Sequence, residues 1–194
     1  MERAQLKSLA KQQIKGNVGT MFLISIVTAL VAGLANLVPV VGSIASVVIL
    51  APAFSLAVVA IYLNMTNGQK AQVGDLFSRF NDFWAAFKVN FLVGFFTALW
   101  SMLFVIPGIV KAYSYSQAMF ILAENPNIGA LEAINRSKAM MNGHKMDLFI
   151  LELSFIGWHI LGGLTFGIAY IWIIPYISAA KANFYNSIKN PVEA

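Results

Sequence analysis

The sequence predicts an all-α protein: a polytopic transmembrane helical bundle of about six crossings arranged as three hairpins, with interfacial amphipathic helices. Hydrophobic residues make up 59% of the 194 residues and charged residues only 11%, whereas a soluble domain is about half apolar and a quarter charged. The interval between Lys15 and Lys70 holds no charged residue. Since one helical crossing needs about 20 apolar residues, this interval has room for two crossings and a turn. Residues 89–110 and 153–180 also lack Asp, Glu, Lys and Arg.

The chain is expected to form a single membrane domain over residues 1–194. Within it we expect a basic interfacial helix over 1–15, a transmembrane bundle over 17–186 and a cytoplasmic tail over 187–194. Apolar runs and their polar or Gly/Pro-containing breaks place the six crossings in order along the chain. They are expected at 17–37, 41–64, 85–100, 101–123, 147–162 and 164–186.

The distribution of positive charge predicts the topology. The turns expected on one side, at 38–42, 94–101 and 162–163, carry no charge. The other side receives ten cations: Arg3, Lys7, Lys11, Lys15, Lys70, Arg79, Arg136, Lys138, Lys145 and Lys189. By the positive-inside rule both termini are therefore expected in the cytoplasm. The formal net charge of +5 is thus explained by topology, so no nucleic-acid partner is expected.

Three segments have the pattern of helices that lie in the membrane interface. In residues 3–15 the cations recur at every fourth position, while apolar residues lie largely elsewhere on the helix. In residues 76–91 aromatic side chains recur at helical spacing, which is typical of a membrane anchor. Residues 127–141 alternate apolar and charged positions at the same spacing, between Asn125-Pro126 and Asn142-Gly143.

Prolines and glycines suggest further features, each with two interpretations. Pro52, Pro107 and Pro175 each follow two apolar residues in the second arm of a hairpin, so they are predicted to kink helices. Kinked helices can surround a transport site, but proline is also simply common in membrane helices. Gly163 and Gly167 form a GxxxG pair, which predicts close helix packing, either within the chain or in a homodimer.

Two charged residues inside the expected crossings are candidates for an intramembrane polar site. Such residues are costly in a bilayer and usually face the protein interior or water. Lys111, Ser114 and Tyr115 share one helical face, and Glu152 lies at a similar expected depth in the fifth crossing. We therefore predict that Lys111 and Glu152 pair, with Tyr115 nearby, and line a cavity open to the cytoplasm. The alternatives are that Lys111 snorkels to an interface and that Glu152 is shallow enough to be hydrated.

The sequence lacks the usual signatures of catalysis and metal binding. It has no cysteine and two histidines, and it contains no HExxH, GxSxG or phosphate-loop motif. We therefore expect no catalytic residue, no cofactor-binding residue and no metal site, and we predict that the protein is not an enzyme.

Several stretches together resemble the domain of unknown function 975 family of bacterial integral membrane proteins. The resemblance covers roughly residues 1–188 and is carried by IPGIVKAYSYSQAMFILAENP, EAINRSKAMMNGHKMDLF, LSFIGWHIL and PYISAAKANFY. It implies a multi-pass helical protein of the bacterial plasma membrane. It implies no established activity, so no functional residue can be transferred from the family.

These observations favour non-enzymatic binding of an amphiphilic anionic partner, in envelope maintenance or self-immunity. The candidate partners are lipid headgroups, a membrane-active peptide or another membrane protein. The alternative is a small secondary transporter or transport accessory subunit, which the repeated prolines and the Lys111–Glu152 pair would suit. An intramembrane enzyme is disfavoured because no nucleophile–base pair is evident.

Overall fold

The computed structural model describes residues 3–35, 37 and 46–189. Most of these residues are in helices joined by short turns, and none of them is in a β-strand. The predicted all-α class is therefore confirmed. The elements are α1 (Arg3–Lys15), α2 (Val18–Ala35), the π-helix η1 (Ser46–Leu50), α4 (Ala51–Thr66), the 3₁₀ turns η2 (Val73–Phe77) and η3 (Phe80–Asp82), α5 (Phe83–Leu103), α6 (Val105–Tyr115), α7 (Ala118–Glu124), α8 (Ala130–Met140), α9 (Lys145–Leu153), α10 (Ile156–Leu164) and α11 (Tyr170–Lys189).

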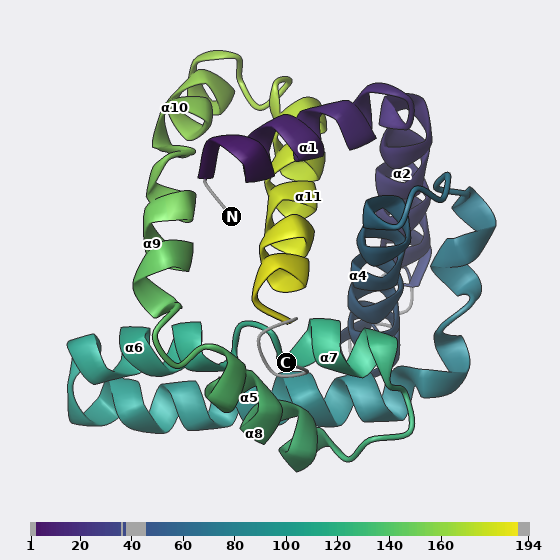
Figure 1. The fold of residues 1–194 in the computed structure, drawn as a ribbon. Helices are drawn as coiled ribbons and strands as arrows, with labels where there is room; N and C mark the ends of the chain where they lie inside the picture. The colour runs from purple at the N-terminus through teal and green to yellow at the C-terminus, as the bar shows by residue number, and fades with distance from the viewer. Residues whose placement is uncertain (1–2, 36, 38–45, 190–194) are drawn as a thin grey trace.

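Figure 1 shows how these helices are arranged. Helices α2, α4, α9 and α11 stand upright in the view, α1 runs across the top, and α5 and α6 lie side by side across the bottom. Helices α5 and α6 approach closely because Gly108 has no side chain: a Cβ atom there would lie 2.8 Å from the Cα of Ser101. The two helices thus form a tight antiparallel hairpin.

Among the described residues, three helical segments are long and apolar enough to cross a membrane: Ser46–Thr66, Val73–Met102 and Lys145–Leu164. A fourth is possible if α1 and α2, which meet at a bend of 80°, count as one broken span. These spans fit a membrane protein, whereas six crossings in three hairpins stay a prediction. The expected turn at 38–42 lies outside the described residues, as does the end of the expected tail at 190–194.

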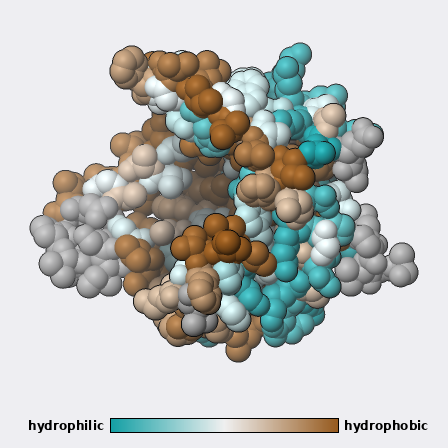
Figure 2. Space-filling model, turned by 90° about the vertical axis from the view of Figure 1, so that its left-hand side faces the viewer, coloured by the Kyte–Doolittle hydropathy of each residue, from teal (hydrophilic) through white to brown (hydrophobic). Residues whose placement is uncertain are grey.

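Polar and apolar residues gather on different sides of the molecule. Figure 2 shows hydrophilic residues mainly on its right-hand side, which is the side that faces the viewer in Figure 1, and hydrophobic residues mainly on its left. Large apolar side chains are exposed along α5, including Trp84 (51% exposed), Phe91 (58%) and Phe95 (48%). So much exposed apolar surface is unusual for a protein surrounded by water.

Helix α1 packs on the protein with the face that the sequence assigns to the membrane interface. Leu6, Ala10 and Ile14 are at most 2% exposed and join a buried cluster with residues of α11. The Gln13 and Asn183 carboxamides exchange two hydrogen bonds, of 2.8 and 3.1 Å. The interfacial assignment of residues 1–15 therefore needs correcting in one respect: this apolar face is covered by α11, not by lipid.

The two other predicted interfacial helices differ in how regular they are. Residues 76–91 do not form one continuous helix, because η2 and η3 precede the start of α5 at Phe83. Residues 127–141 contain the regular helix α8, whose buried residues include Ala133, Ile134 and Ser137.

The prolines occupy different places in their helices. Pro52 lies in the first turn of α4, directly after η1, and Pro107 lies in the first turn of α6. The first four N–H groups of a helix have no intrahelical partner, so proline costs no hydrogen bond at Pro107. Pro52 differs, because η1 continues into α4 and Ser46–Thr66 is one helical segment. The predicted mid-helix kink at Pro107 is therefore wrong, because α6 begins at Val105. Pro175 lies inside α11, and Pro52 lies inside the helical segment that η1 and α4 form together.

The glycines that allow close packing are not those of the GxxxG pair. A Cβ atom at Gly163 or Gly167 would meet nothing within 4 Å, and Gly167 has a φ of +89°, which suits a turn. The close approach is at Gly162, where a Cβ atom would lie 2.6 Å from the Tyr170 ring. The predicted packing of Gly163 and Gly167 within the chain is therefore wrong, because α10 ends at Leu164 and the pair spans a turn.

Candidate functional site

Glu152 connects three helices through its two carboxylate oxygens. Its Oε1 lies 2.7 Å from Lys181 Nζ on α11, and its Oε2 accepts a hydrogen bond of 2.6 Å from the Tyr113 hydroxyl on α6. The Glu152 and Lys181 side chains are 33% and 39% exposed. The negative charge of Glu152 is therefore compensated by contacts from α6 and α11, as a partly buried charge requires.

The predicted partner of Glu152, Lys111, lies elsewhere. Its Nζ is 4.5 Å from the centroid of the Trp100 ring on α5, a cation–π contact. Each helical residue advances by about 100°, so Lys111 and Tyr113 point about 200° apart around α6. Because Tyr113 faces α9, Lys111 faces away from it. The predicted ion pair with Lys111 is therefore wrong, and Lys181 takes its place.

Ser114 and Tyr115 lie in the packing between helices, not on an open cavity. Ser114 is 4% exposed; its hydroxyl donates to the Val110 carbonyl, and its own carbonyl accepts a hydrogen bond of 2.8 Å from Ser137 on α8. Tyr115 is 6% exposed and its ring lies 6.3 Å from that of Phe96 on α5. Both residues therefore hold α6 against its neighbours.

A cavity of about 650 Å³ lies between α4, α7, α8 and α11, in a place that the sequence did not indicate. We call it the Glu124 pocket. Its charged lining residues are Arg79, Glu124, Arg136 and Lys189, and its carboxamides are Asn64, Asn67 and Asn125. Three positive side chains and one negative side chain give the lining a net charge of +2.

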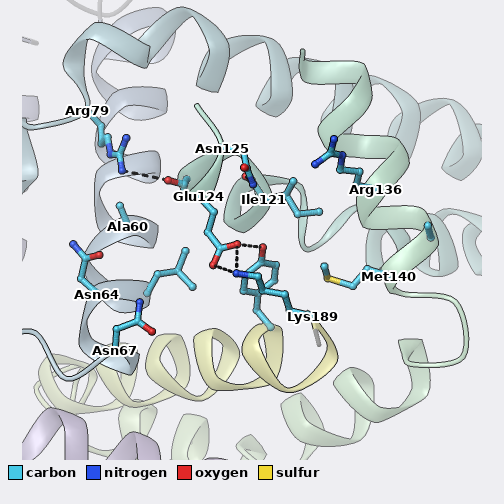
Figure 3. A pocket seen from close by; sticks show the side chains of 14 residues that line it. Ala60, Asn64, Asn67, Arg79, Ile121, Glu124, Asn125, Arg136, Met140 and Lys189 are labelled. Atoms are coloured by element: carbon cyan, nitrogen blue, oxygen red, sulfur yellow. Dashed lines mark hydrogen bonds and ion pairs between the residues drawn. The ribbon is translucent and has the colours of Figure 1, made fainter. Parts of the chain in front are cut away.

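Glu124 is held at the centre of this pocket by two residues of α11. Lys189 Nζ lies 2.9 Å from Oε1 and 2.8 Å from Oε2, and the Tyr185 hydroxyl donates to Oε2 over 2.8 Å. Figure 3 shows Glu124 and Lys189 between the other labelled side chains, joined by dashed lines. The Glu124 carboxylate is thus already neutralised by Lys189, which leaves two guanidinium groups on the walls.

The two arginines lie on opposite sides of the Glu124–Lys189 pair (Figure 3). Arg79 donates to the carbonyl of Ala123 over 3.2 Å and pairs with Asp82 at 3.5 Å. Arg136 pairs with Glu132 at 2.8 Å, and both side chains are 52% exposed. Neither Asp82 nor Glu132 lines the pocket. Exposed pairs contribute only about 0–1 kcal/mol, so a ligand anion can compete with Glu132 for the Arg136 guanidinium group. The Arg79–Asp82 pair is less exposed, at 29% for each side chain, but its contact is longer.

Two helix ends place the polar side chains around the pocket. Helix α7 ends at Glu124 because Asn125 precedes Pro126, and a residue before proline disfavours helical backbone; Asn125 has φ −127° and ψ 76°. Helix α4 ends at Thr66, where the Asn67 N–H bonds back to Leu63 and Asn64 carbonyls. Gly68 follows with a φ of +81°, a conformation that favours glycine.

The rest of the pocket wall is apolar and comes from the same helices. Ala60 and Leu63 belong to α4, Ile121 to α7, and Ala139 and Met140 to α8. A pocket with a positive polar part beside an apolar wall suits a ligand with an anionic head and an apolar remainder. Within the described part of the chain, no three His, Asp or Glu residues are placed to hold a metal ion.

The sequence contained the residues of this pocket but no pattern that joins them. The sequence analysis used the positive charges of Arg79, Arg136 and Lys189 only to predict the membrane topology. It predicted no role for Glu124. They are far apart in sequence and come together through the packing of α7 between α4 and α8. The only available signal was Asn125-Pro126, which predicts that a helix ends beside Glu124.

The fold and its exposed apolar surface define the class: an all-helical protein that has, in the part of the chain that the structure describes, three helices long and apolar enough to span a membrane. A family model described as "Protein of unknown function (DUF975)" matches residues 1–114 and 102–191. The chain belongs to this family. No match was found among curated proteins or among solved structures.

Proposed function

We propose that the protein is a multi-pass protein of the bacterial plasma membrane, with six crossings in three hairpins and both termini in the cytoplasm. The long apolar helical segments among the described residues and the exposed apolar side chains along α5 support a membrane location. So does the gathering of the basic residues on one side in the predicted topology. In this orientation the Glu124 pocket lies at the cytoplasmic side, because Arg79, Arg136 and Lys189 are among the cations assigned there.

The chain has no cysteine, so single introduced cysteines report topology directly. We expect Lys70→Cys and Lys138→Cys to resist an impermeant thiol reagent in intact cells and to react after the cells are opened. Leu37→Cys, at a position that is 74% exposed, is expected to react in intact cells. Labelling of Lys70→Cys or Lys138→Cys from outside would overturn the topology.

We further propose that the protein binds, without catalysis, an anionic amphiphile in the Glu124 pocket, and that this serves envelope maintenance or self-immunity. The observation that carries the proposal is the net charge of +2 beside an apolar wall. An anionic head would lie against Arg79, Arg136 and Lys189, and the apolar remainder along Leu63 and Met140. Three cations favour an anionic lipid over a cationic membrane-active peptide, which they would repel.

Native mass spectrometry of the full-length protein in mild detergent tests this proposal. We expect retention of an anionic phospholipid to exceed that of phosphatidylcholine, and to weaken with salt because partly exposed charges are screened. The triple variant Arg79→Gln, Arg136→Gln and Lys189→Gln should lose the preference. Lys138→Gln, which removes an exposed cation outside the pocket lining, should keep it. Equal retention of both lipids by the unmodified protein would overturn the proposal.

A further inference from the structure

Two exposed asparagines at the end of α4 present their side-chain carboxamides to the Glu124 pocket. Asn64 and Asn67 both line the pocket, and Figure 3 places them on the same side as Arg79. In the part of the chain that the structure describes, neither side-chain carboxamide makes a hydrogen bond, although the backbone of both residues does. Each carboxamide supplies two N–H donors and one carbonyl acceptor.

The charges of the pocket exclude one common kind of headgroup. A zwitterionic head such as phosphoethanolamine or phosphocholine brings an ammonium group beside its phosphate. The one carboxylate of the lining, Glu124, already accepts hydrogen bonds from both Lys189 and Tyr185. An added ammonium group would therefore meet three cations, Arg79, Arg136 and Lys189, whose carboxylate partners are already paired with them. Like charges repel, so such a head is disfavoured.

From these two observations we infer that the head of the ligand is a phosphate ester that carries free hydroxyl groups, as in a phosphoglycerol head. The inference rests on the proposed function and specifies the chemistry of its ligand. The phosphate interacts with the guanidinium groups, where charge-assisted hydrogen bonds are the strong ones. The hydroxyl groups, which both donate and accept, match the Asn64 and Asn67 carboxamides on the neighbouring wall.

Glu124 has a defined part in this selection. It keeps Lys189 and Tyr185 occupied and limits the positive charge that the ligand meets, so a head with a single negative charge is sufficient. Replacing Glu124 by Gln would free Lys189 and raise the positive charge of the lining. Glu124→Gln is therefore expected to bind anionic lipids more tightly in general, while the preference for hydroxyl groups is kept.

The test compares two lipids of equal charge, of which only one has a head with free hydroxyl groups. Phosphatidylglycerol and phosphatidylmethanol both carry one negative charge, but only phosphatidylglycerol has a head with free hydroxyls. We expect the full-length protein to retain phosphatidylglycerol about fivefold better, the effect of one net hydrogen bond. Asn64→Ala with Asn67→Ala should abolish this ratio, because phosphatidylglycerol loses its hydroxyl contacts and is then retained no better than phosphatidylmethanol. Asn135→Ala, an exposed asparagine on α8 outside the lining, is the matched control and should keep it.

Each outcome of the comparison decides something. Equal retention of the two lipids, with both above phosphatidylcholine, would overturn the hydroxyl inference and leave the proposed function standing. Equal retention of all three lipids would overturn both. Free glycerol phosphate distinguishes the source of the head: if it displaces phosphatidylglycerol at similar concentration, the ligand is a soluble phosphate ester. If it does not, the apolar wall contributes and the ligand is a lipid.

Discussion

The contacts of Glu152 lead to a quantitative prediction about which lysine stabilises α9. The Lys181–Glu152 pair, at 2.7 Å with about a third of each side chain exposed, lies between two limits. Exposed pairs contribute about 0–1 kcal/mol, and breaking a buried pair costs about 3–5 kcal/mol. We expect Lys181→Met to cost about 2 kcal/mol, because Glu152 is left with only the Tyr113 hydroxyl.

The assay is a double-mutant cycle read by thermal unfolding in detergent, followed by tryptophan fluorescence. For a chain of this size, about 2 kcal/mol corresponds to a fall in Tm of about 4–8 °C. Lys181→Met and Glu152→Gln together should cost less than the sum of the single changes, with a coupling of at least about 1 kcal/mol. The reason is that the double variant leaves no unpaired charge.

Lys111→Met supplies the matched control for this cycle. The Lys111 ammonium group lies over the Trp100 ring and does not contact Glu152. The free-energy changes of Lys111→Met and Glu152→Gln should therefore be additive within about 0.5 kcal/mol. If Lys111 couples to Glu152 and Lys181 does not, the arrangement of α6, α9 and α11 described here is refuted. Tyr113→Phe should lower stability as well, by about 1.5 kcal/mol, because a hydrogen bond to a carboxylate is lost.

Two further predictions concern packing. Gly162→Ala should destabilise the protein by about 1–3 kcal/mol, because the added Cβ would overlap the Tyr170 ring. The control Gly163→Ala, where a Cβ would meet nothing within 4 Å, should leave Tm unchanged or raise it. Equal effects of the two variants would contradict the contact between α10 and the start of α11. Gln13→Ala should lower the stability by at least about 1 kcal/mol, because the carboxamide of Asn183, a residue that is 5% exposed, loses its hydrogen-bond partner. The control is Gln12→Ala, at the exposed neighbouring position. An equal loss of stability in both variants would contradict the docking of α1 on α11.

Composition and charge spacing predicted the helical class and the bounds of the first helix. The uncharged intervals are long because α2 and α4 carry no charged residue and α5 carries none after Lys88. Such intervals can be recognised directly in the sequence. The cations at every fourth position likewise marked residues 3–15 as a helix, and α1 runs from Arg3 to Lys15. What covers its apolar face was not predictable, because periodicity does not distinguish lipid from α11.

The partner of Glu152 was not predictable from depth. Lys111 and Lys181 both lie in the cytoplasmic halves of their expected crossings, so a depth argument cannot choose between them. The direction of each side chain around its helix decides, and this depends on how α6 and α11 are rotated against α9. The error at Pro107 has a similar origin: an apolar run does not reveal that a new helix begins at Val105.

The Glu124 pocket was not predictable because it is formed by four helices that are distant in sequence. Glu124 and Lys189 are paired across α7 and α11, and nothing in either segment indicates the other. The positive-inside rule accounts for the positive charge of the residues near the helix ends. It does not predict how these residues are arranged in space. The three-dimensional packing alone shows that Arg79, Arg136 and Lys189 line one cavity.

Photo-crosslinking tests the central claim, that an anionic amphiphile binds in the Glu124 pocket, most directly. A photoactivatable phosphatidylglycerol with the reactive group near its head is bound to the full-length protein, and the crosslinked peptides are identified by mass spectrometry. We predict crosslinks at Ile121, Met140 and Tyr185, which line the pocket, and their loss in the triple variant Arg79→Gln, Arg136→Gln and Lys189→Gln. Crosslinks confined to the exposed aromatic face of α5, at Trp84 and Phe91, and unchanged in that variant, would contradict the claim.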